Sequence, residues 1–347
     1  MKAVVLVGGE GTRLRPLTET VPKPLLPFMN RPFLDHVLDH LARHGVDEVI
    51  CSSPYLEERF HGFLESRSSA RPAVTWITEA EPLGTAGAIA GAREHVDGTF
   101  LALNGDVLTD IDVTGLIAAH REHEATATIA LTAVDDARPF GLVETEEDGR
   151  VTAFREKPEV RIPGRVNAGI YVLEPRALDR VSPGVMVSIE RETYPDLIRR
   201  GEPVLGQLAD GYWRDLGNPA AYLQGHVDAL DGRIEAYRGT TGPLVAAGAG
   251  VDPSARIEEH VVVAPGAEVG RNATVARSVL HADVSVGAEA VVDGSILGAR
   301  SRVESGAEVR EAVLAEGARV PEGVRLVRTT LGPGEVASDP GRAASVR

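Results

Sequence analysis

The feature that most constrains the fold of this chain is a six-residue repeat of aliphatic side chains in its last third. Small residues and glycines fill the positions between them. A hexapeptide period is typical of a parallel β-helix, in which each hexad forms one face of a triangular coil. We therefore predict a left-handed parallel β-helix over residues 251–330 rather than an ordinary β-rich domain. The repeat runs through Val251, Ile257, Val263, Val269 and Val275 and then, with a 17-residue period, through Leu280, Val286, Val292, Leu297, Val303, Val309, Leu314, Val320 and Leu326.

The first 230 residues show a different pattern, in which short apolar runs alternate with segments of helical periodicity. This alternation predicts a Rossmann-like α/β fold with a mainly parallel sheet covered by helices. Small residues predict a helix over residues 86–95 with Thr85 as its N-cap, and another helix is expected over 222–230. The predicted strands are Ala3–Val7, Val49–Ser52, Val74–Thr78 and Phe100–Leu103.

These patterns divide the chain into four parts. Residues 1–230 form the α/β domain, and residues 231–250 form a linker. The β-helix occupies residues 251–330. Residues 331–347 are rich in Gly, Ser and Pro and are expected to be a disordered tail.

Composition limits the partners and the compartment of the protein. The chain has 36 basic and 51 acidic residues, a net charge of −15, which argues against a nucleic-acid-binding surface. No stretch reaches the roughly 18 apolar residues that a membrane span requires, and the N-terminal apolar run lacks the cleavage site of a signal peptide. The one cysteine, Cys51, predicts a buried thiol in a reducing environment. We therefore expect a cytoplasmic protein with no membrane or nucleic-acid partner.

A glycine-rich loop follows the first predicted strand and leads into a cluster of cations. Its glycines let the backbone approach a ligand closely, and the N–H groups of such a loop form a cradle for an anion. Prolines restrain the cation-bearing segment, and the motifs of a P-loop and of a dinucleotide-binding turn are both missing. The loop consists of Gly8, Gly9, Gly11 and Thr12, and the cations are Arg13, Arg15 and Lys23.

Several short motifs follow this loop in the first 230 residues. They are Pro82-Leu83-Gly84-Thr85-Ala86-Gly87, Asn104-Gly105-Asp106, Phe140-Gly141, Phe154-Arg155-Glu156-Lys157-Pro158, Asn167-Ala168-Gly169-Ile170-Tyr171, Ser188-Ile189-Glu190-Arg191-Glu192 and Tyr212-Trp213-Arg214-Asp215-Leu216-Gly217. Together with the loop, they resemble the sugar-1-phosphate nucleotidylyltransferases, also called nucleotide-sugar pyrophosphorylases. The likeness is closest to the mannose-1-phosphate guanylyltransferase branch.

The resemblance implies a reaction and a metal ion. A nucleotidyl group would pass from a nucleoside triphosphate to a sugar 1-phosphate and release pyrophosphate. Mg²⁺ held by one or two carboxylates would offset the charge of the triphosphate, with Asp106 and Asp215 as candidate ligands. Arg13 and Lys23 would stabilise charge on the α-phosphate and on the departing pyrophosphate. Taken alone, either aspartate could be a turn residue.

The matched motifs also imply substrate contacts. The nucleotide is expected along Gly8, Gly9, Gly11, Thr12, Gly84 and Thr85. The sugar phosphate is expected at Gly141, Glu156, Lys157 and Asn167. In the family, the glutamate accepts hydrogen bonds from sugar hydroxyls and the lysine holds the phosphate. Without the neighbouring motifs, the Glu-Lys pair would be an ordinary surface ion pair.

Glu79 is predicted to read the base. It lies just after a predicted strand, in the segment that flanks the base in this family, where thymidylyl relatives place a glutamine. A carboxylate can accept the two adjacent donors of guanine, N1–H and N2–H₂. Glu81 could serve instead, or Glu79 could be a solvated loop carboxylate.

Three histidines, His36, His40 and His44, recur at the spacing of one helix face. They lie among aspartates but lack the spacing of a zinc site, so we interpret them as a solvated helix face.

GTP and mannose 1-phosphate, or a related hexose, heptose or cyclitol 1-phosphate, are the favoured substrates. The main alternative is a sister transferase that uses dTTP, ATP or UTP with glucose 1-phosphate. A non-catalytic regulatory homologue and an acyltransferase on the β-helix, with His260 or His281 as base, are weaker alternatives. Because a solenoid presents flat faces suited to subunit contact, we expect a homo-oligomer formed through the β-helix.

Overall fold

The computed structural model describes residues 1–54, 57–67 and 70–338. The chain divides into two compact units, each of which is made of two segments that are separate in the sequence. The first unit contains Met1–Gly9 and Leu34–Trp213, and the second contains Glu10–Phe33 and the chain from Arg214 onward. The segment that carries Arg13 and Lys23 is therefore grouped with the C-terminal strands.

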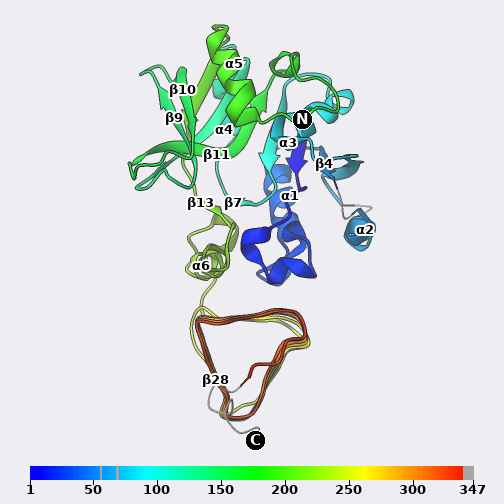
Figure 1. The fold of residues 1–347 in the computed structure, drawn as a ribbon, viewed down its shortest axis with the longest axis vertical. Coiled ribbons are helices and arrows are strands. Elements are labelled where there is room, and N and C mark those ends of the chain that lie inside the picture. The colour runs from blue at the N-terminus through cyan, green and yellow to red at the C-terminus, as the bar shows by residue number, and fades with distance from the viewer. Residues whose placement is uncertain (55–56, 68–69, 339–347) are drawn as a thin grey trace, which may run out of the picture. The chain divides into compact units, whose positions relative to one another are not determined.

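The first unit is built on a nine-stranded sheet with a parallel centre (Figure 1). The central order is β6-β1-β4-β5, and Ala3 of β1 lies opposite Val49 of β4 and Leu101 of β6. Ala3, Val4 and Val5 are fully buried, as expected for a parallel strand covered on both faces. The strands are β1 (Lys2–Leu6), β4 (Glu48–Ser53), β5 (Ala73–Thr78), β6 (Phe100–Asn104), β8 (Ala127–Val134), β9 (Gly141–Thr145), β10 (Val151–Glu156), β11 (Gly164–Leu173) and β12 (Val204–Leu208).

Antiparallel strands extend this parallel centre. Strand β11 pairs with β6, β8 and β9, and β9 pairs with β10, all antiparallel, while β12 pairs with β8 in parallel. The predicted α/β class is confirmed. Cys51 of β4 is fully buried, as predicted, and burial raises the pKa of its thiol to about 12.

The helices before residue 214 are α1 (Phe33–Arg43), α2 (Glu57–Ser66), α3 (Gly84–Gly91), α4 (Val113–Glu122) and α5 (Tyr194–Arg199). The prediction that Thr85 caps a helix over 86–95 is wrong. Helix α3 begins at Gly84, which has a φ of 66°, and ends at Gly91 before a 3₁₀ turn at Arg93–His95. The Thr85 hydroxyl is instead occupied by hydrogen bonds to the segment around Glu190.

The interpretation of α1 as a solvated histidine face is wrong for His40. Its side chain is only 3% exposed, and its ring packs against His44 at a centroid distance of 4.8 Å. Burial, with smaller contributions from His44 and Arg43, lowers the pKa of His40 to about 4. The spacing of His36, His40 and His44 places them on one side of the helix. It does not determine how deeply each side chain is buried, and His40 is the one that is buried.

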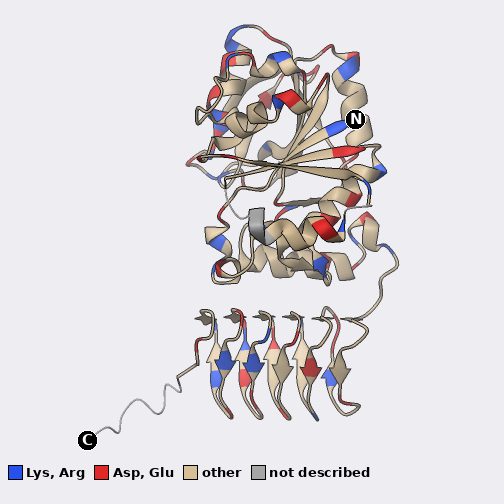
Figure 2. Ribbon diagram, turned by 90° about the vertical axis from the view of Figure 1, so that its right-hand side faces the viewer, with Lys and Arg blue, Asp and Glu red and all other residues tan. Residues whose placement is uncertain are grey.

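The second unit contains three all-parallel sheets, which form the three faces of a triangular coil (Figure 1). Successive turns of the chain stack on one another along this coil (Figure 2). This arrangement is that expected for the predicted left-handed β-helix. Val263, Leu280, Leu297 and Leu314 of the six-residue repeat are all fully buried in one core. The ladders begin at β14 (Leu244–Val245), before the predicted start at residue 251.

The first sheet contains β14 (Leu244–Val245), β17 (Val262–Val263), β20 (Val279–Leu280), β23 (Ile296–Leu297), β26 (Val313–Leu314) and β29 (Thr330–Leu331). The second contains β15 (Gly250–Val251), β18 (Glu268–Val269), β21 (Ser285–Val286), β24 (Arg302–Val303) and β27 (Arg319–Val320). The third contains β16 (Arg256–Ile257), β19 (Thr274–Ala276), β22 (Val291–Asp293), β25 (Glu308–Arg310) and β28 (Arg325–Val327). Residues 339–347 of the predicted tail lie outside the described residues.

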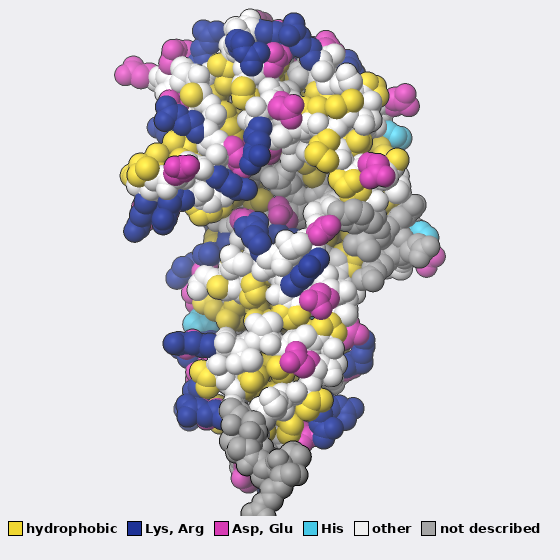
Figure 3. All heavy atoms as spheres, viewed as in Figure 1, with side chains coloured by type: hydrophobic (Ala, Val, Ile, Leu, Met, Phe, Trp, Pro, Cys, Tyr) yellow, Lys and Arg dark blue, Asp and Glu magenta, His cyan; other side chains and the backbone are white. Residues whose placement is uncertain are grey.

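Charged residues of both signs occur along the coils (Figure 2), and their side chains are interspersed on the face shown in Figure 3. Asp293 pairs with Arg277 at 2.7 Å and with Arg310 at 3.2 Å, linking neighbouring turns. Because exposed ion pairs contribute little, the buried aliphatic column is the main source of stability in this β-helix.

The rest of the second unit comprises a small hairpin, β2 (Pro27–Phe28) and β3 (Arg31–Pro32), and helix α6 (Pro219–Leu230). The predicted helix over 222–230 is thus confirmed. Two short strands remain. Strand β7 (Val107–Thr109) belongs to the first unit, and β13 (Trp213–Asp215) contains the boundary at which the first unit ends and the second resumes. Within the described part of the chain, no helix combines the length and the apolar character that crossing a bilayer requires.

Candidate active site

Asp106 and the first glycines of the loop emerge at the same edge of the central sheet. Strand β1 ends at Leu6, directly before Val7, Gly8 and Gly9, and Leu6 lies opposite Asn104 at the end of β6. The Gly105 N–H donates to the Leu6 carbonyl at 2.9 Å, and a Cβ on Gly105 would lie only 2.7 Å from that oxygen. Ligands of open α/β sheets bind at the carboxyl ends of strands, which is where this turn holds Asp106.

Glu79 is buried and holds the loop that precedes α3. Its side chain is 7% exposed, Ser52 Oγ donates to Oε1 at 2.8 Å, and the Leu83 N–H donates to Oε2 at 3.0 Å. Glu79 is therefore not a solvated loop carboxylate. Each of its oxygens already accepts one hydrogen bond and has one further lone pair.

Gly84 and Thr85 pack against the segment that leads to Glu190. A Cβ on Gly84 would lie 2.8 Å from the Val187 carbonyl oxygen. The Thr85 hydroxyl donates to Glu190 Oε2 at 2.8 Å and accepts from the Ile189 N–H at 2.8 Å. The same segment forms a turn of π-helix, Ile189–Thr193, a rare element that is frequent at functional sites.

The predicted sugar-phosphate residues Gly141, Glu156 and Lys157 are brought together by strands β9 and β10. Gly141 lies directly opposite Glu156 in the antiparallel ladder, and a Cβ on Gly141 would lie 2.9 Å from Glu156 Oε2. Lys157 Nζ lies 3.5 Å from Glu156 Oε1. Lys157 has a φ of 51°, a left-handed conformation that costs energy for a lysine, and its N–H is held by the Phe140 carbonyl.

Asn167 belongs to a polar network with Tyr171 and Glu190, two residues for which the sequence motifs predicted no role. Asn167 Nδ2 donates to the Tyr171 hydroxyl at 2.8 Å, and Asn167 Oδ1 accepts from the Gly169 N–H at 2.8 Å. Glu190 accepts from Ser188 Oγ at 2.7 Å. Burial, followed by the Glu190 charge, raises the pKa of Tyr171 well above its ordinary value, so its hydroxyl stays protonated. The matched motif over residues 188–192 was the signal for Glu190.

In the second unit, Arg13 and Lys23 meet at Asp215. Arg13 Nη2 lies 3.5 Å from Asp215 Oδ2, and Lys23 Nζ lies 3.8 Å from Asp215 Oδ1. The Lys23 side chain is 9% exposed, whereas that of Arg13 is 64% exposed. Gly11 and Thr12 also belong to this unit, and Gly11 is the N-cap of the 3₁₀ turn Thr12–Leu14. This unit thus concentrates positive charge around one carboxylate in an acidic protein.

Asp106 in the first unit and Asp215 in the second each carry the type of ligand that a magnesium ion prefers. Asp106 is half-buried, and the Asp215 side chain is 23% exposed. Among the residues that the structure describes, no group of three or more His, Cys, Asp or Glu side chains is arranged to hold a metal. Mg²⁺ does not require such a group, because it is usually bound by one or two carboxylates together with substrate phosphates and water.

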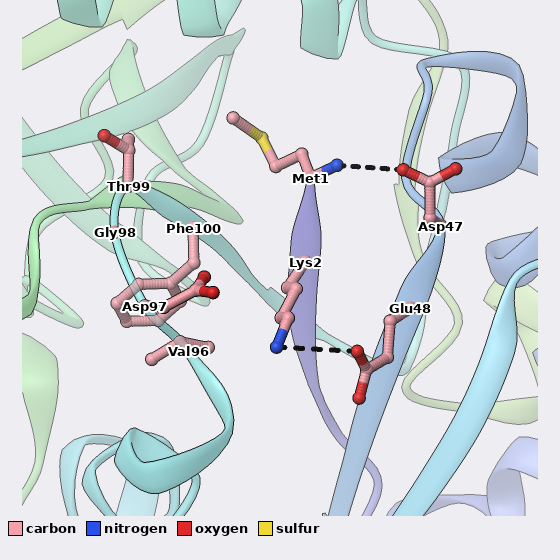
Figure 4. A pocket seen from close by; sticks show the side chains of 9 residues that line it. All are labelled: Met1, Lys2, Asp47, Glu48, Val96, Asp97, Gly98, Thr99 and Phe100. Atoms are coloured by element: carbon pink, nitrogen blue, oxygen red, sulfur yellow. Dashed lines mark hydrogen bonds and ion pairs between the residues drawn. The ribbon is translucent and has the colours of Figure 1, made fainter.

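Two cavities lie away from these residues. One, of about 240 Å³, is at the opposite end of the central strands and is lined by the first residues of β1 and β4 (Figure 4). There Lys2 pairs with Glu48 at 3.5 Å. The other, of about 530 Å³, is lined by residues 325–338 at the last turn of the β-helix. Neither cavity contains a predicted site residue.

Comparison with known proteins agrees with the motifs. The model of the nucleotidyl transferase family matches residues 2–232, and that of the GMPPB C-terminal domain matches residues 241–339. This chain belongs to the nucleotidyl transferase family. Nucleotidyltransferases of this family generally use a divalent metal ion.

Similar proteins match most of the length of this nucleotidyltransferase. The mannose-1-phosphate guanylyltransferase of Mycobacterium tuberculosis is 40% identical over 80% of this chain and 79% of its own length. Mannose-1-phosphate guanylyltransferase 1 of Arabidopsis thaliana is 37% identical over 80% of this chain and 79% of its own length. The crystal structure of HddC from Yersinia pseudotuberculosis complexed with GMP-PN superposes with a TM-score of 0.56 and 27% identity, covering 65% of this chain and 97% of that chain.

The histidines considered for acyl transfer are placed poorly for that role. His281 is 5% exposed, its Nε2 lies 3.0 Å from the Tyr222 hydroxyl, and burial lowers the pKa of its ring to about 4. His260 Nε2 lies 2.7 Å from Asp231 Oδ1 and is thereby occupied. A base for an external substrate needs an accessible nitrogen, which His281 lacks.

Proposed function

We propose that this nucleotidyltransferase transfers a guanylyl group from GTP to mannose 1-phosphate, forming GDP-mannose and pyrophosphate. The pairing of Arg13 and Lys23 with Asp215 carries the proposal that the site is catalytic. The choice of substrates is supported by the names of relatives that are 37–40% identical over most of their length. The complex of HddC with GMP-PN supports a guanine nucleotide. A sister transferase that uses dTTP, ATP or UTP with glucose 1-phosphate is the remaining alternative.

In the proposed reaction, a phosphate oxygen of mannose 1-phosphate attacks the α-phosphorus of GTP in line, and pyrophosphate leaves. No covalent intermediate with the protein is needed, so positioning and electrostatics carry the catalysis. Arg13 and Lys23 stabilise the negative charge that develops on the α-phosphate and on the leaving group. The glycine loop and the Gly84-Thr85 turn position the triphosphate, and Glu79 accepts from the guanine edge.

The sugar phosphate is proposed to bind at the β9–β10 ladder. Glu156 accepts hydrogen bonds from sugar hydroxyls, and the Lys157 ammonium pairs with the phosphate. Glycine at position 141 leaves the Glu156 carboxylate in place, because a side chain there would meet Phe154 and Glu156. Asn167 is proposed as a further hydroxyl contact, with its orientation set by Gly169 and Tyr171.

Asp106 and Asp215 are the proposed ligands of Mg²⁺, which supplies charge neutralisation of the triphosphate when it is bound. An intact set of Arg13, Lys23, Asp106 and Asp215 argues against a non-catalytic homologue. A homo-oligomer formed through the β-helix and a cytoplasmic location remain part of the proposal.

Pyrophosphate release measured across GTP, dTTP, ATP and UTP, each with a panel of sugar 1-phosphates, tests the proposal. We expect the highest kcat/KM with GTP and mannose 1-phosphate. With this sugar phosphate, GTP should exceed any other triphosphate at least about tenfold, since one missing pair of base hydrogen bonds costs that much. Higher kcat/KM with dTTP and glucose 1-phosphate would favour the sister transferase. Turnover of acetyl-CoA in place of any triphosphate would favour the acyltransferase.

A further inference from the structure

The hairpin that follows Lys23 ends in a strained turn. Met29 and Asn30 join β2 to β3 with φ values of 48° and 64°. Two consecutive positive φ values are those of a type I′ hairpin turn, which asparagine tolerates and methionine does not favour. A bulky residue stays in this conformation only where the surroundings hold it.

Helix α6 and the β-helix hold this turn from two sides. The Met29 N–H donates to His226 Nε2 on α6 at 3.3 Å, and His226 Nδ1 lies 2.9 Å from the Tyr222 carbonyl oxygen. Because Nε2 accepts, the proton of this neutral ring is on Nδ1 and faces its own helix. Asn30 Nδ2 donates to the Val263 carbonyl of β17 at 3.1 Å.

The Tyr222 hydroxyl links the same hairpin to the β-helix. It donates to the Pro27 carbonyl, and His281 Nε2 lies 3.0 Å from the same hydroxyl oxygen. A hydroxyl has a single proton, so when it donates to Pro27 it must accept from His281. Tyr222 is 1% exposed and His281 is 5% exposed, so water does not compete for these groups.

These contacts lie within a few residues of the charged cluster. The Leu26 N–H donates to the Lys23 carbonyl at 3.1 Å, and the Phe33 N–H donates to the Leu26 carbonyl at 3.0 Å, so the hairpin is tied to the turn that carries Lys23. On the other side of the cluster, buried Asp228 of α6 lies 2.9 Å from Arg214 Nη2, one residue before Asp215. Helix α6 thus contacts the hairpin that follows Lys23 and also Arg214, which precedes Asp215.

We propose that the β-helix, through α6, positions the cation-bearing segment 10–33 for nucleotidyl transfer, with Tyr222 and His281 as positioning residues. This inference goes beyond the predicted assembly role of the β-helix. It rests on the proposed function only for its effect on turnover. Because catalysis by positioning is sensitive to shifts of about 1 Å, loosening the hairpin should reduce the rate without removing any group that contacts substrate.

The test compares Tyr222→Phe and His281→Leu, each of which removes one partner of the Tyr222–His281 hydrogen bond, with Ser278→Ala in the full chain. Ser278 is a matched control, since it is fully buried in the β-helix, and its hydroxyl donates to the Ala276 carbonyl and accepts from the Ser295 N–H. Two readouts are used, steady-state kinetics and amide hydrogen exchange over residues 22–33. We expect both test variants to speed exchange in this segment about tenfold and to lower kcat about tenfold, with KM for the sugar phosphate within about twofold.

The double variant Tyr222→Phe/His281→Leu should fall no lower in kcat than the lower of the two single variants, because both changes act through one hydroxyl. Exchange over residues 22–33 that stays at the wild-type rate in both variants, or that rises equally in Ser278→Ala, would overturn the inference. Hydrogen exchange decides it even if wild-type protein turns over none of the triphosphates, an outcome that would defeat only the proposed function. If Tyr222→Phe fails to fold, His281→Leu alone carries the test.

Discussion

Lys23 Nζ lies 3.8 Å from Asp215 Oδ1 although the two residues are far apart in sequence, and the Lys23 side chain is 9% exposed. A nearly buried ammonium beside a carboxylate loses little conformational freedom when a further anion arrives. It is therefore preorganised to stabilise charge that develops during a reaction.

Replacing Lys23 should reduce the rate far more than it reduces binding. For Lys23→Gln we expect kcat to fall by about 100- to 1000-fold, the loss typical of one preorganised electrostatic contact. Lys2→Gln is the control, since Lys2 also pairs with a carboxylate, Glu48, but at the opposite end of the central strands. Pyrophosphate release within twofold of wild type in Lys23→Gln would refute the role.

Asp106→Asn should abolish turnover while the protein stays folded. The substitution removes a charge at the carboxyl end of β6 and keeps the shape of the side chain. We expect at least about a 100-fold loss of kcat and a weaker dependence of the rate on Mg²⁺ concentration. Asp112→Asn is the control, because Asp112 caps α4 and asparagine caps equally well. Normal Mg²⁺-dependent turnover by folded Asp106→Asn protein would contradict the metal assignment.

Glu79→Gln should weaken the use of GTP more than the use of dTTP. Glutamine can still donate to Ser52 Oγ and accept from the Leu83 N–H, so the loop remains tied. What it loses is the second acceptor for the guanine edge, which is worth roughly tenfold to several hundredfold in kcat/KM. An equal loss with both triphosphates would mean that Glu79 only holds the loop.

Gly141→Ala should raise KM for the sugar phosphate by about tenfold, because the new methyl group would meet Phe154 and Glu156 Oε2 at less than 3.0 Å and displace the carboxylate. Gly62→Ala on α2 is the matched control, since a Cβ there meets nothing within 4 Å. An unchanged KM in folded Gly141→Ala would show that Glu156 does not contact the sugar phosphate.

Acidification should destabilise the protein through its buried histidines. Burial lowers the pKa of His40 to about 4, whereas an unfolded histidine has a pKa of about 6.5. The unfolded state therefore binds the proton more tightly, and stability is lost as the pH falls from above 6.5 towards 4. Between pH 7 and 5 this amounts to about 2 kcal/mol for His40.

Urea unfolding at pH 7 and pH 5 measures this effect. The loss of unfolding free energy should be smaller by about 2 kcal/mol in His40→Gln than in wild type, because glutamine does not titrate. His123→Gln serves as the exposed control and should leave the loss unchanged. An identical pH dependence in wild type and His40→Gln would show that His40 does not cause it.

Residue patterns along the chain are enough to predict the two architectures of this protein. The six-residue period predicts the β-helix because only a coil with three short faces buries every sixth residue, and Val263 through Leu314 do fill its core. The alternation of apolar runs and helical segments likewise predicts the α/β unit. Gly8, Gly9 and Asp106 follow predicted strands, so their common location at one edge of the sheet could be deduced from the parallel order.

Which side chains lie together, and how deeply they are buried, depends on the three-dimensional packing of the elements. Periodicity does not reveal that His40 is buried, that Glu79 is held by Ser52 and Leu83, or that Thr85 bonds to Glu190 instead of capping a helix. Nor does it reveal that His281 contacts Tyr222, because that hydrogen bond joins residues whose local patterns are unrelated. Local spacing determines elements and their apolar faces, whereas such long-range polar contacts depend on how finished elements pack against one another.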